Sequence, residues 1–180
     1  VDLVEGNALG EAVTAPRTGG VLIIGPVPPP KGGITIHIQR LARLYSEHGI
    51  SCQLLDESRV LKSDIANIRN LSLSSYLKLL RNSDVVHIHS SNRYLRLLHT
   101  VVARCVGRKV LQTVHGHDPR PLPRLCLRAA CRLSDVRIAV SDAVSAEIGV
   151  PSLVIPAFIG PSQDEDEAPK DIVAFIETHR

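Results

Sequence analysis

The sequence of 180 residues contains no methionine and no tryptophan, and aromatic residues make up only 3% of it. Because methionine is absent, the chain does not begin at a natural start codon, and we expect it to be a processed or excised piece of a longer protein. Cysteine is also sparse, and the four cysteines include no Cys-x-x-Cys pair, which excludes a disulfide framework. Each lies among apolar residues, so we expect buried thiols in a reducing compartment; they are Cys52, Cys105, Cys126 and Cys131.

Long apolar runs are missing as well. No stretch approaches the roughly 18 residues of a membrane-spanning helix, and residues 1–19 lack the basic-then-apolar pattern of a signal peptide. We expect residues 1–19 to form a poorly ordered leader. The net charge of +3 is too small to predict a nucleic-acid partner. With 44% apolar and 22% charged residues, the composition is that of a globular domain with its own core.

Short apolar strands alternate with helical patterns along the chain. This alternation predicts an α/β, Rossmann-like domain over residues 20–160, with a mostly parallel sheet and helices on both faces. Residues 161–180 read as an acidic, proline-flanked linker and a short amphipathic helix. The expected strands are 21–24, 51–56, 84–89, 109–115, 136–140 and 152–156, and the expected helices begin near residues 34, 63 or 64, 94, 123 and 141 or 142.

The loop after the first strand carries Lys31, Gly32 and Gly33 immediately before an amphipathic helix. Bare backbone N–H groups at a helix N-terminus suit a phosphate or a carboxylate. The loop is neither a Walker A motif nor a dinucleotide-binding fingerprint. The structural alternative is a turn in which the Gly-Gly pair supplies a positive φ.

Polar side chains gather where the predicted strands end, which is the edge of an open parallel sheet where ligands bind. Five of the eight histidines belong to this set or lie near it, if His37 on the first helix is counted. A histidine inside a strand is usually a packed core residue, and we interpret His87 in this way. The other members are His89, Ser90, Ser91, Asn92, His115, Gly116, His117, Asp118, Ser141 and Asp142.

Four segments occur in an order that resembles the N-terminal, acceptor-side domain of family 4 glycosyltransferases, which have the two-domain GT-B architecture. They are DVVHIHSS (84–91), VLQTVHGHD (110–118), SDVRIAVSDAVSAEI (134–148) and VIPAFI (154–159), and with the Gly-Gly loop the match covers about residues 20–180. The resemblance implies that Gly32 and Gly33 lie near the donor diphosphate and the acceptor. It also implies that His115 faces the reacting sugar as the catalytic residue, with Lys31 beside the glycines. The acceptor-side candidates are His89, Ser90, Asn92, His117, Asp118 and Ser141.

The chain departs from this family in one respect. Members hold the nucleotide sugar with a C-terminal domain marked by two glutamates eight positions apart, and no two glutamates here have that spacing. We therefore expect this chain to be the acceptor-binding half of a transferase. The donor-binding domain is missing from this chain, so we expect the chain to be inactive alone. The resemblance implies a nucleotide-sugar donor, a sugar, lipid-linked or small-molecule acceptor, retention of configuration, and no metal or other cofactor in this chain. It also implies a cytoplasmic protein, peripheral to the membrane.

Two other functions stay open. A metal-dependent hydrolase could use histidines of neighbouring strand ends as zinc ligands, and its candidate set is His87, His89, His115, His117 and Asp118. The other alternative is a binding module without catalytic activity.

Arginine recurs every four residues from Arg120 to Arg132. From Arg124 onward, with Arg128 and Arg132, these side chains should line one helix face opposite Leu125, Ala129 and Leu133. Such a face is either simply solvated or in contact with anionic lipid headgroups, where each basic group adds roughly 1 kcal/mol.

Overall fold

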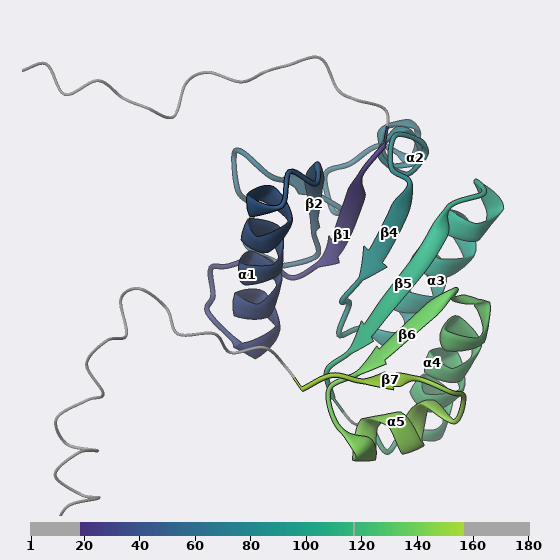
Figure 1. The fold of residues 1–180 in the computed structure, drawn as a ribbon. Helices are drawn as coiled ribbons and strands as arrows, with labels where there is room; N and C mark the ends of the chain where they lie inside the picture. The colour runs from purple at the N-terminus through teal and green to yellow at the C-terminus, as the bar shows by residue number, and fades with distance from the viewer. Residues whose placement is uncertain (1–18, 117, 157–180) are drawn as a thin grey trace, which may run out of the picture.

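A computed structural model describes residues 19–116 and 118–156 of the chain. Within these ranges seven strands alternate with five helices (Figure 1). In chain order the elements are β1 (Val21–Gly25), α1 (Gly33–Glu47), β2 (Cys52–Asp56), β3 (Ala66–Asn67), α2 (Leu73–Arg81), β4 (Val85–Ile88), α3 (Arg93–Cys105), β5 (Lys109–Val114), α4 (Pro121–Leu133), β6 (Val136–Ala139), α5 (Asp142–Ile148) and β7 (Leu153–Val154).

The seven strands form one parallel sheet in the order β3-β2-β1-β4-β5-β6-β7. From β1 the chain builds the sheet outward through β2 to β3. It then crosses back to β4, on the other side of β1, and builds outward through β5 and β6 to β7. Right-handed crossovers in opposite directions place their helices on opposite faces. The predicted α/β, Rossmann-like domain with helices on both faces is therefore confirmed, and β1 and β4 flank its topological switch point.

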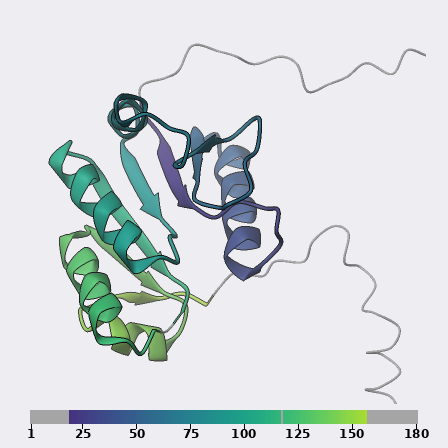
Figure 2. The same cartoon turned by 180° about the vertical axis from the view of Figure 1, so that it is seen from behind.

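Three apolar clusters hold the helices on the sheet. α1 packs on β1 and β2 through a cluster centred on Ile23 and Ile38. On the other face, α2 and α3 cover β1, β2 and β4 through residues such as Leu80 and Ala103. α4 and α5 extend that second layer over β5 and β6 around Leu127. Figure 2 shows α3 and α4 side by side on this face, with α1 behind the sheet.

The segment before α2 differs from the prediction. The helix expected to begin at Ser63 or Asp64 is absent there, because Ala66 and Asn67 pair with β2 as a short strand. Ile65 packs with the α1 cluster and Ile68 with the α2–α3 cluster, as the two faces of a strand require. The helix begins only at Leu73, where the side chain of Ser72 accepts a hydrogen bond from the N–H of Ser75.

The cysteines also differ from the expected uniform burial. Cys131 is buried, Cys52 and Cys126 are half-buried, and Cys105 is exposed at the last residue of α3. All four are free thiols.

None of the helices in the described ranges is long and apolar enough to span a membrane. The expected leader up to residue 18, His117 and the expected linker and helix over 161–180 lie outside the described residues.

Candidate functional site

The candidate site lies at the carboxyl edge of the sheet, around the switch point between β1 and β4. The loop from β1 to α1 is on one side of this point, and the loop from β4 to α3 is on the other. The turn after β5 adds His115 beside them. The parallel arrangement thus brings together three chain segments that carry most of the predicted site residues.

Neither glycine at the tip of the first loop has a positive φ, so the interpretation of this pair as a strained turn is wrong. Gly32 is extended, with a φ of −160°, and Gly33 is the first residue of α1. A Cβ built on Gly33 would meet no atom within 4 Å, and one on Gly32 would meet only the Oγ1 of Thr35, at 3.9 Å. The fold therefore does not demand glycine at either position.

The N-terminus of α1 has no capping side chain, because its N-cap residue is Gly32. Thr35 arranges the backbone here: its Oγ1 accepts a hydrogen bond from the N–H of Gly32 at 2.8 Å and donates to the carbonyl of Gly32 or Pro30. Lys31, Gly32 and Gly33 are all exposed. A helix of 15 residues thus presents a bare, electropositive N-terminus at the edge of the site.

Asp56, at the end of β2, anchors the base of this loop. Its Oδ1 atom accepts a hydrogen bond of 3.0 Å from the N–H of Val27, and its side chain is completely buried. Lys62 and Ser58 bond to the same carboxylate, and Asn67 of β3 completes its environment. Burial raises the pKa of Asp56, but the hydrogen bonds from Lys62 and Ser58 outweigh it, and the pKa lies below its usual value.

Four histidine rings contact one another in tilted or edge-on arrangements near the ends of β4 and β5. The Nδ1 atom of His89 lies 2.9 Å from the Nε2 atom of His115. The ring centroid of His37 is 4.9 Å from that of His115 and 5.3 Å from that of His89. The ring of His87 contacts that of His89 on the same strand segment, with centroids 4.1 Å apart and an interplanar angle of 44°.

The four rings differ in what they can do. As expected, His87 is a packed strand residue: its Nε2 atom bonds to Thr113 at 2.8 Å and its Nδ1 atom to Tyr45 at 3.4 Å. His89 is completely buried, so it supports His115 rather than lining an open surface. His37 and His115 are half-buried and border two different cavities.

Burial keeps these rings uncharged near neutral pH. Burial, followed by repulsion from His37 and Arg96, lowers the pKa of His115 to about 3. Burial and the neighbouring histidines lower the pKa of His87 to about 3 and that of His89 well below its usual value. Burial also lowers the pKa of His37. Each neutral ring retains one lone pair and one N–H donor.

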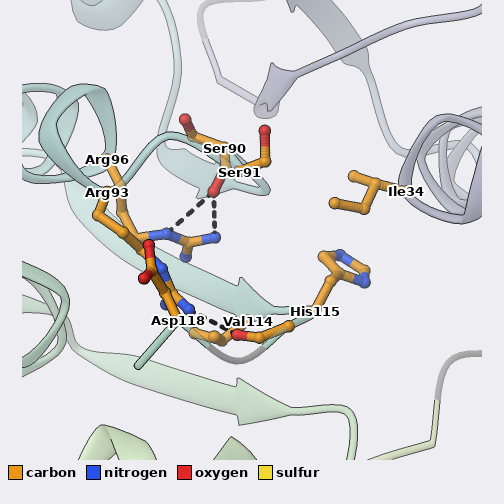
Figure 3. A pocket seen from close by; sticks show the side chains of 9 residues that line it. Ile34, Ser90, Ser91, Arg93, Arg96, Val114, His115 and Asp118 are labelled. Atoms are coloured by element: carbon orange, nitrogen blue, oxygen red, sulfur yellow. Dashed lines mark hydrogen bonds between the residues drawn. The ribbon is translucent and has the colours of Figure 1, made fainter. Parts of the chain in front are cut away.

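A cavity of about 250 Å³ opens beside His115. Figure 3 shows Ile34, from the first turn of α1, reaching toward the His115 ring, with Ser90 and Ser91 from the β4–α3 loop above and Asp118 on the opposite side. Ile34 directly follows Gly33. Within the described residues, the cavity therefore brings together Ile34 of the first turn of α1, the serine loop and His115, whereas Lys31, Gly32 and Gly33 are not among its lining residues.

Two buried arginines, which no pattern in the sequence singles out, fix the walls of this cavity. Arg96 is 2% exposed and donates to the carbonyls of Ser90 and Thr113, which ties the end of β4 to the end of β5. Arg93 donates to the carbonyl of Gly116 at 2.6 Å and to Glu147 at 3.3 Å. Arginine on a helix is usually solvated, and here the backbone carbonyls together with Glu147 and the side chain of Gln112 provide the partners that allow burial.

The remaining predicted residues have mixed placements. Ser90 is buried and lines the cavity. Asp118 also lines it, and hydrogen bonds from Arg120 lower the pKa of this carboxyl to about 2. Asn92 caps α3 by accepting from the N–H groups of Tyr94 and Leu95, so its side chain serves the helix. Ser141 likewise caps α5 by accepting from the N–H of Val144.

The hydrolase ligand set does not converge in the described residues. Both ring nitrogens of His87 have hydrogen-bond partners, the carboxylate of Asp118 is bonded to Arg120, and His117 lies outside the described residues. The histidines whose ring nitrogens do converge are His37, His89 and His115. His37 is not among the candidate ligands predicted from the sequence, because its position on a helix gives no sign of where its ring lies.

The expected basic face on α4 is wrong in its orientation. The buried stripe of this helix is Pro123, Leu127, Ala130 and Cys131. Arg128 is half-buried and donates to the carbonyl of Glu147 in α5 at 3.1 Å, and the Nε atom of Arg124 is buried. Arg132 is exposed, but so are Leu125 and Leu133, which were expected on the opposite face.

The fold matches one half of a GT-B glycosyltransferase. The HepE protein of Anabaena in complex with UDP-glucose aligns at a TM-score of 0.61 and 13% identity, over 89% of this chain and 50% of that chain. The same protein in complex with UDP aligns at 0.52 and 15% identity, with the same coverage. An alpha-glucosyltransferase in complex with UDP and a 13-mer DNA containing a central A:G mismatch aligns at 0.51 and 19% identity, over 71% of this chain and 38% of that chain.

These likenesses concern the fold, and the chain spans about half the length of the HepE structures that it matches. No protein-family model matches the sequence, and no curated protein is similar to it. The chain is thus a Rossmann-like domain with the architecture of one half of a GT-B enzyme.

Proposed function

We propose that this chain is the acceptor-binding half of a glycosyltransferase that moves a sugar from a nucleotide-sugar donor to an acceptor hydroxyl. One observation supports this most directly. Ile34, in the first turn of the uncapped helix α1, and His115 line the same cavity, at the switch point of a fold that matches half of a GT-B enzyme. The family resemblance of the sequence adds retention of configuration and a metal-independent chemical step to the proposal.

The glycine loop is proposed to face the diphosphate of the donor. Uncapped N–H groups and the helix dipole together favour an anion at this position. No described atom of the chain lies within 4 Å of where a Cβ of Gly33 would be. The missing Cβ therefore leaves room for a ligand to approach the backbone. Lys31 is exposed next to it and adds a positive charge. The nucleotide and most of the donor sugar would be held by the second domain of the complete enzyme.

His115 is proposed as the catalytic residue. Because its pKa is lowered to about 3, its ring is neutral at physiological pH and can donate one hydrogen bond and accept another. A neutral donor can bind a sugar hydroxyl or stabilise charge that develops on the leaving phosphate. His89 fixes the orientation of this ring through their 2.9 Å contact, so it acts as a positioning residue.

The acceptor is proposed to occupy the cavity beside His115. Ser90, Ser91 and Asp118 offer hydroxyl and carboxylate groups there, which suit a hydroxyl-bearing acceptor such as a sugar. The cavity of about 250 Å³ is smaller than the roughly 300–1,000 Å³ of a typical ligand pocket. The second domain would therefore supply the opposite wall.

Peripheral attachment at the cytoplasmic face of a membrane is proposed from α4. Leu122, Leu125 and Leu133 are exposed on this helix, and Arg132 is exposed beside them. Exposed leucines together with arginine are typical of helices that bind anionic lipid interfaces.

The site can be tested on the chain itself by titrating the ¹⁵N-labelled protein with UDP-glucose and recording amide shifts. We expect weak binding whose largest shifts fall on residues 31–35 and on Gly116, and no transfer of sugar by the chain alone. The Gly33→Val variant should lose these shifts while keeping the rest of its spectrum. Shifts that map elsewhere, or sugar transfer by the isolated chain, would contradict the proposal.

A further inference from the structure

Three histidine rings from three separate elements converge beside the proposed catalytic position. His37 comes from α1, His89 follows β4 and His115 follows β5. Each ring offers one nitrogen atom, and these three nitrogen atoms all lie within 4.8 Å of one another. Residues 37, 89 and 115 are far apart in the sequence, so only the sheet and the packing of α1 bring them together.

The Nδ1 atom of His37 is buried and has no hydrogen-bond partner among the described residues. The Nε2 atom of His89 is also buried without a partner there, but it points away from the Nδ1 atom through which the same ring contacts His115. Buried polar atoms are almost always satisfied, and an unsatisfied one points to an unseen ion or water. By contrast, both ring nitrogens of the adjacent His87 are bonded to protein atoms.

We propose that His37, His89 and His115 together bind one divalent transition-metal ion, with zinc as the best-fitting member of that class. Neutral imidazole is a preferred ligand of zinc, copper and nickel, and three histidines with one open position form a known type of zinc coordination. The set contains no carboxylate or carbonyl ligand, which disfavours magnesium and calcium.

Zinc binding requires the three rings as a group to draw closer together. Zinc–nitrogen bonds of about 2.0–2.1 Å at tetrahedral angles place ligand nitrogens about 3.3 Å apart. The 2.9 Å between His89 and His115 would open by a few tenths of an ångström, and the longer separations would close. The proton now between these two rings would move to the other nitrogen of the ring that carries it, so both rings stay neutral and present a lone pair.

Metal binding at this site does not rest on the transfer reaction, although both would use His115. A ring nitrogen of His115 that coordinates an ion cannot also bond to a sugar. The ion would lie between the two cavities, because His115 lines one and His37 lines the other. If the transferase proposal also holds, zinc would inhibit the enzyme by occupying His115.

The test measures metal binding on the full 180-residue chain after treatment with EDTA. Calorimetry with Zn²⁺ and visible absorption with Co²⁺ should each show one ion per chain, and the Co²⁺ spectrum should have the intensity of tetrahedral coordination without a thiolate band. His37→Gln should weaken Zn²⁺ binding more than about tenfold, since even removal of an outer-sphere partner of a ligand costs 10–100-fold. His37 is only half-buried, so this variant should keep the fold, which circular dichroism would verify.

Two matched controls separate this site from other zinc-binding groups. His48→Gln removes an exposed histidine at the end of the same helix, and Cys105→Ser removes the exposed thiol; both should bind Zn²⁺ like wild type. Zn²⁺ should also raise the thermal unfolding midpoint of the wild type and leave that of His37→Gln unchanged. Equal Zn²⁺ affinity in wild type and His37→Gln, or no binding by the wild type, would overturn the proposal.

Discussion

His89 and His115 are joined ring to ring, with 2.9 Å between the Nδ1 atom of one and the Nε2 atom of the other. His89 is completely buried, whereas His115 borders the cavity. The inner ring therefore sets the orientation of the outer one, and the two strand ends that carry them are locked together by Arg96. This relationship determines which substitutions should affect chemistry and which should affect the fold.

Substitution of His115 should affect turnover. In the complete enzyme, His115→Ala should lower kcat by about a hundredfold or more, because loss of one positioned donor costs on the order of 2.7–4 kcal/mol in the barrier. The ring is half-buried at a loop, so the unfolding midpoint should change little. Steady-state kinetics and urea unfolding measure the two effects, and turnover within a few fold of wild type would reject the catalytic assignment.

Substitution of His87 should have the opposite profile. His87→Ala leaves Thr113 and Tyr45 without their shared partner and opens a void between α1 and the sheet. We expect a loss of about 1–3 kcal/mol in the free energy of unfolding from the unpaired buried groups alone. The remaining folded enzyme should keep most of its kcat. A stable His87→Ala enzyme with strongly reduced kcat would mean that the roles of the two histidines are exchanged.

Two glycines of the first loop region should respond differently. Gly33→Val should fold normally, because the space beside it is open and its φ is not positive. In the proposed enzyme, kcat/KM should nevertheless fall strongly, because the side chain would block the proposed diphosphate position. Gly25→Ala is the contrasting control: its Cβ would lie 2.7 Å from Ile38 and 3.0 Å from His89, so it should destabilise the fold. Normal turnover by Gly33→Val would show that the loop is only a structural connection.

Stability should depend on pH through the buried histidines. Their pKa values are lowered from about 6.5, to about 3 for His87 and His115, so the unfolded chain binds protons at a higher pH than the folded chain. The free energy of unfolding should therefore fall as pH drops below 6.5, by up to about 1.4 kcal/mol per pH unit for each ring. Protonation of Asp56 also lowers the free energy of unfolding, but only near and below its usual pKa of 3.8.

Urea unfolding between pH 7 and pH 5, in EDTA, isolates the histidine contribution. His87→Gln should flatten the slope, whereas His48→Gln, at an exposed position, should leave it unchanged. A wild-type free energy of unfolding that stays constant over this range would show that the rings do not resist protonation.

Binding to anionic vesicles should depend on the outer face of α4. Arg132→Gln should weaken binding about fivefold, which corresponds to roughly 1 kcal/mol per basic group, and Leu125→Gln should weaken it further. Leu73→Gln, at a leucine exposed on α2, is the matched control. Activity on a soluble acceptor should not change. Equal sedimentation of all variants with vesicles would leave α4 as an ordinary solvated helix.

The parallel sheet and the edge that carries the site could be predicted because both follow from local patterns. Apolar strands that alternate with amphipathic helices imply parallel strands, and parallel strands bring His89 and His115 to one edge. The short strand β3 could not be predicted, because it depends on pairing with β2 and on the contact between Asn67 and Asp56 across the sequence.

The individual roles of site residues were harder to predict than their location. Asn92 and Ser141 directly precede helices, a position that favours capping, and the structure assigns them to that role. Arg93 and Arg96 gave no signal, because their partners are mainly backbone carbonyls, which are present in every sequence. The orientation of α4 could not be predicted because the leucines Leu125 and Leu133 suggest a buried stripe in the sequence, although both are exposed in the structure.

The anchoring of the glycine loop by Asp56 has a consequence for the thermodynamics of binding. The carboxylate holds the loop at Val27 and Thr35 holds it at Gly32, so the backbone is already ordered before any ligand arrives. Each loop residue that had to be immobilised on binding would cost about 1–2 kcal/mol in conformational entropy, and ordering only a few would cancel the roughly 4 kcal/mol of a millimolar ligand. If the loop binds a diphosphate as proposed, a side chain beneath the loop would thereby govern whether such a weakly held ligand binds at all.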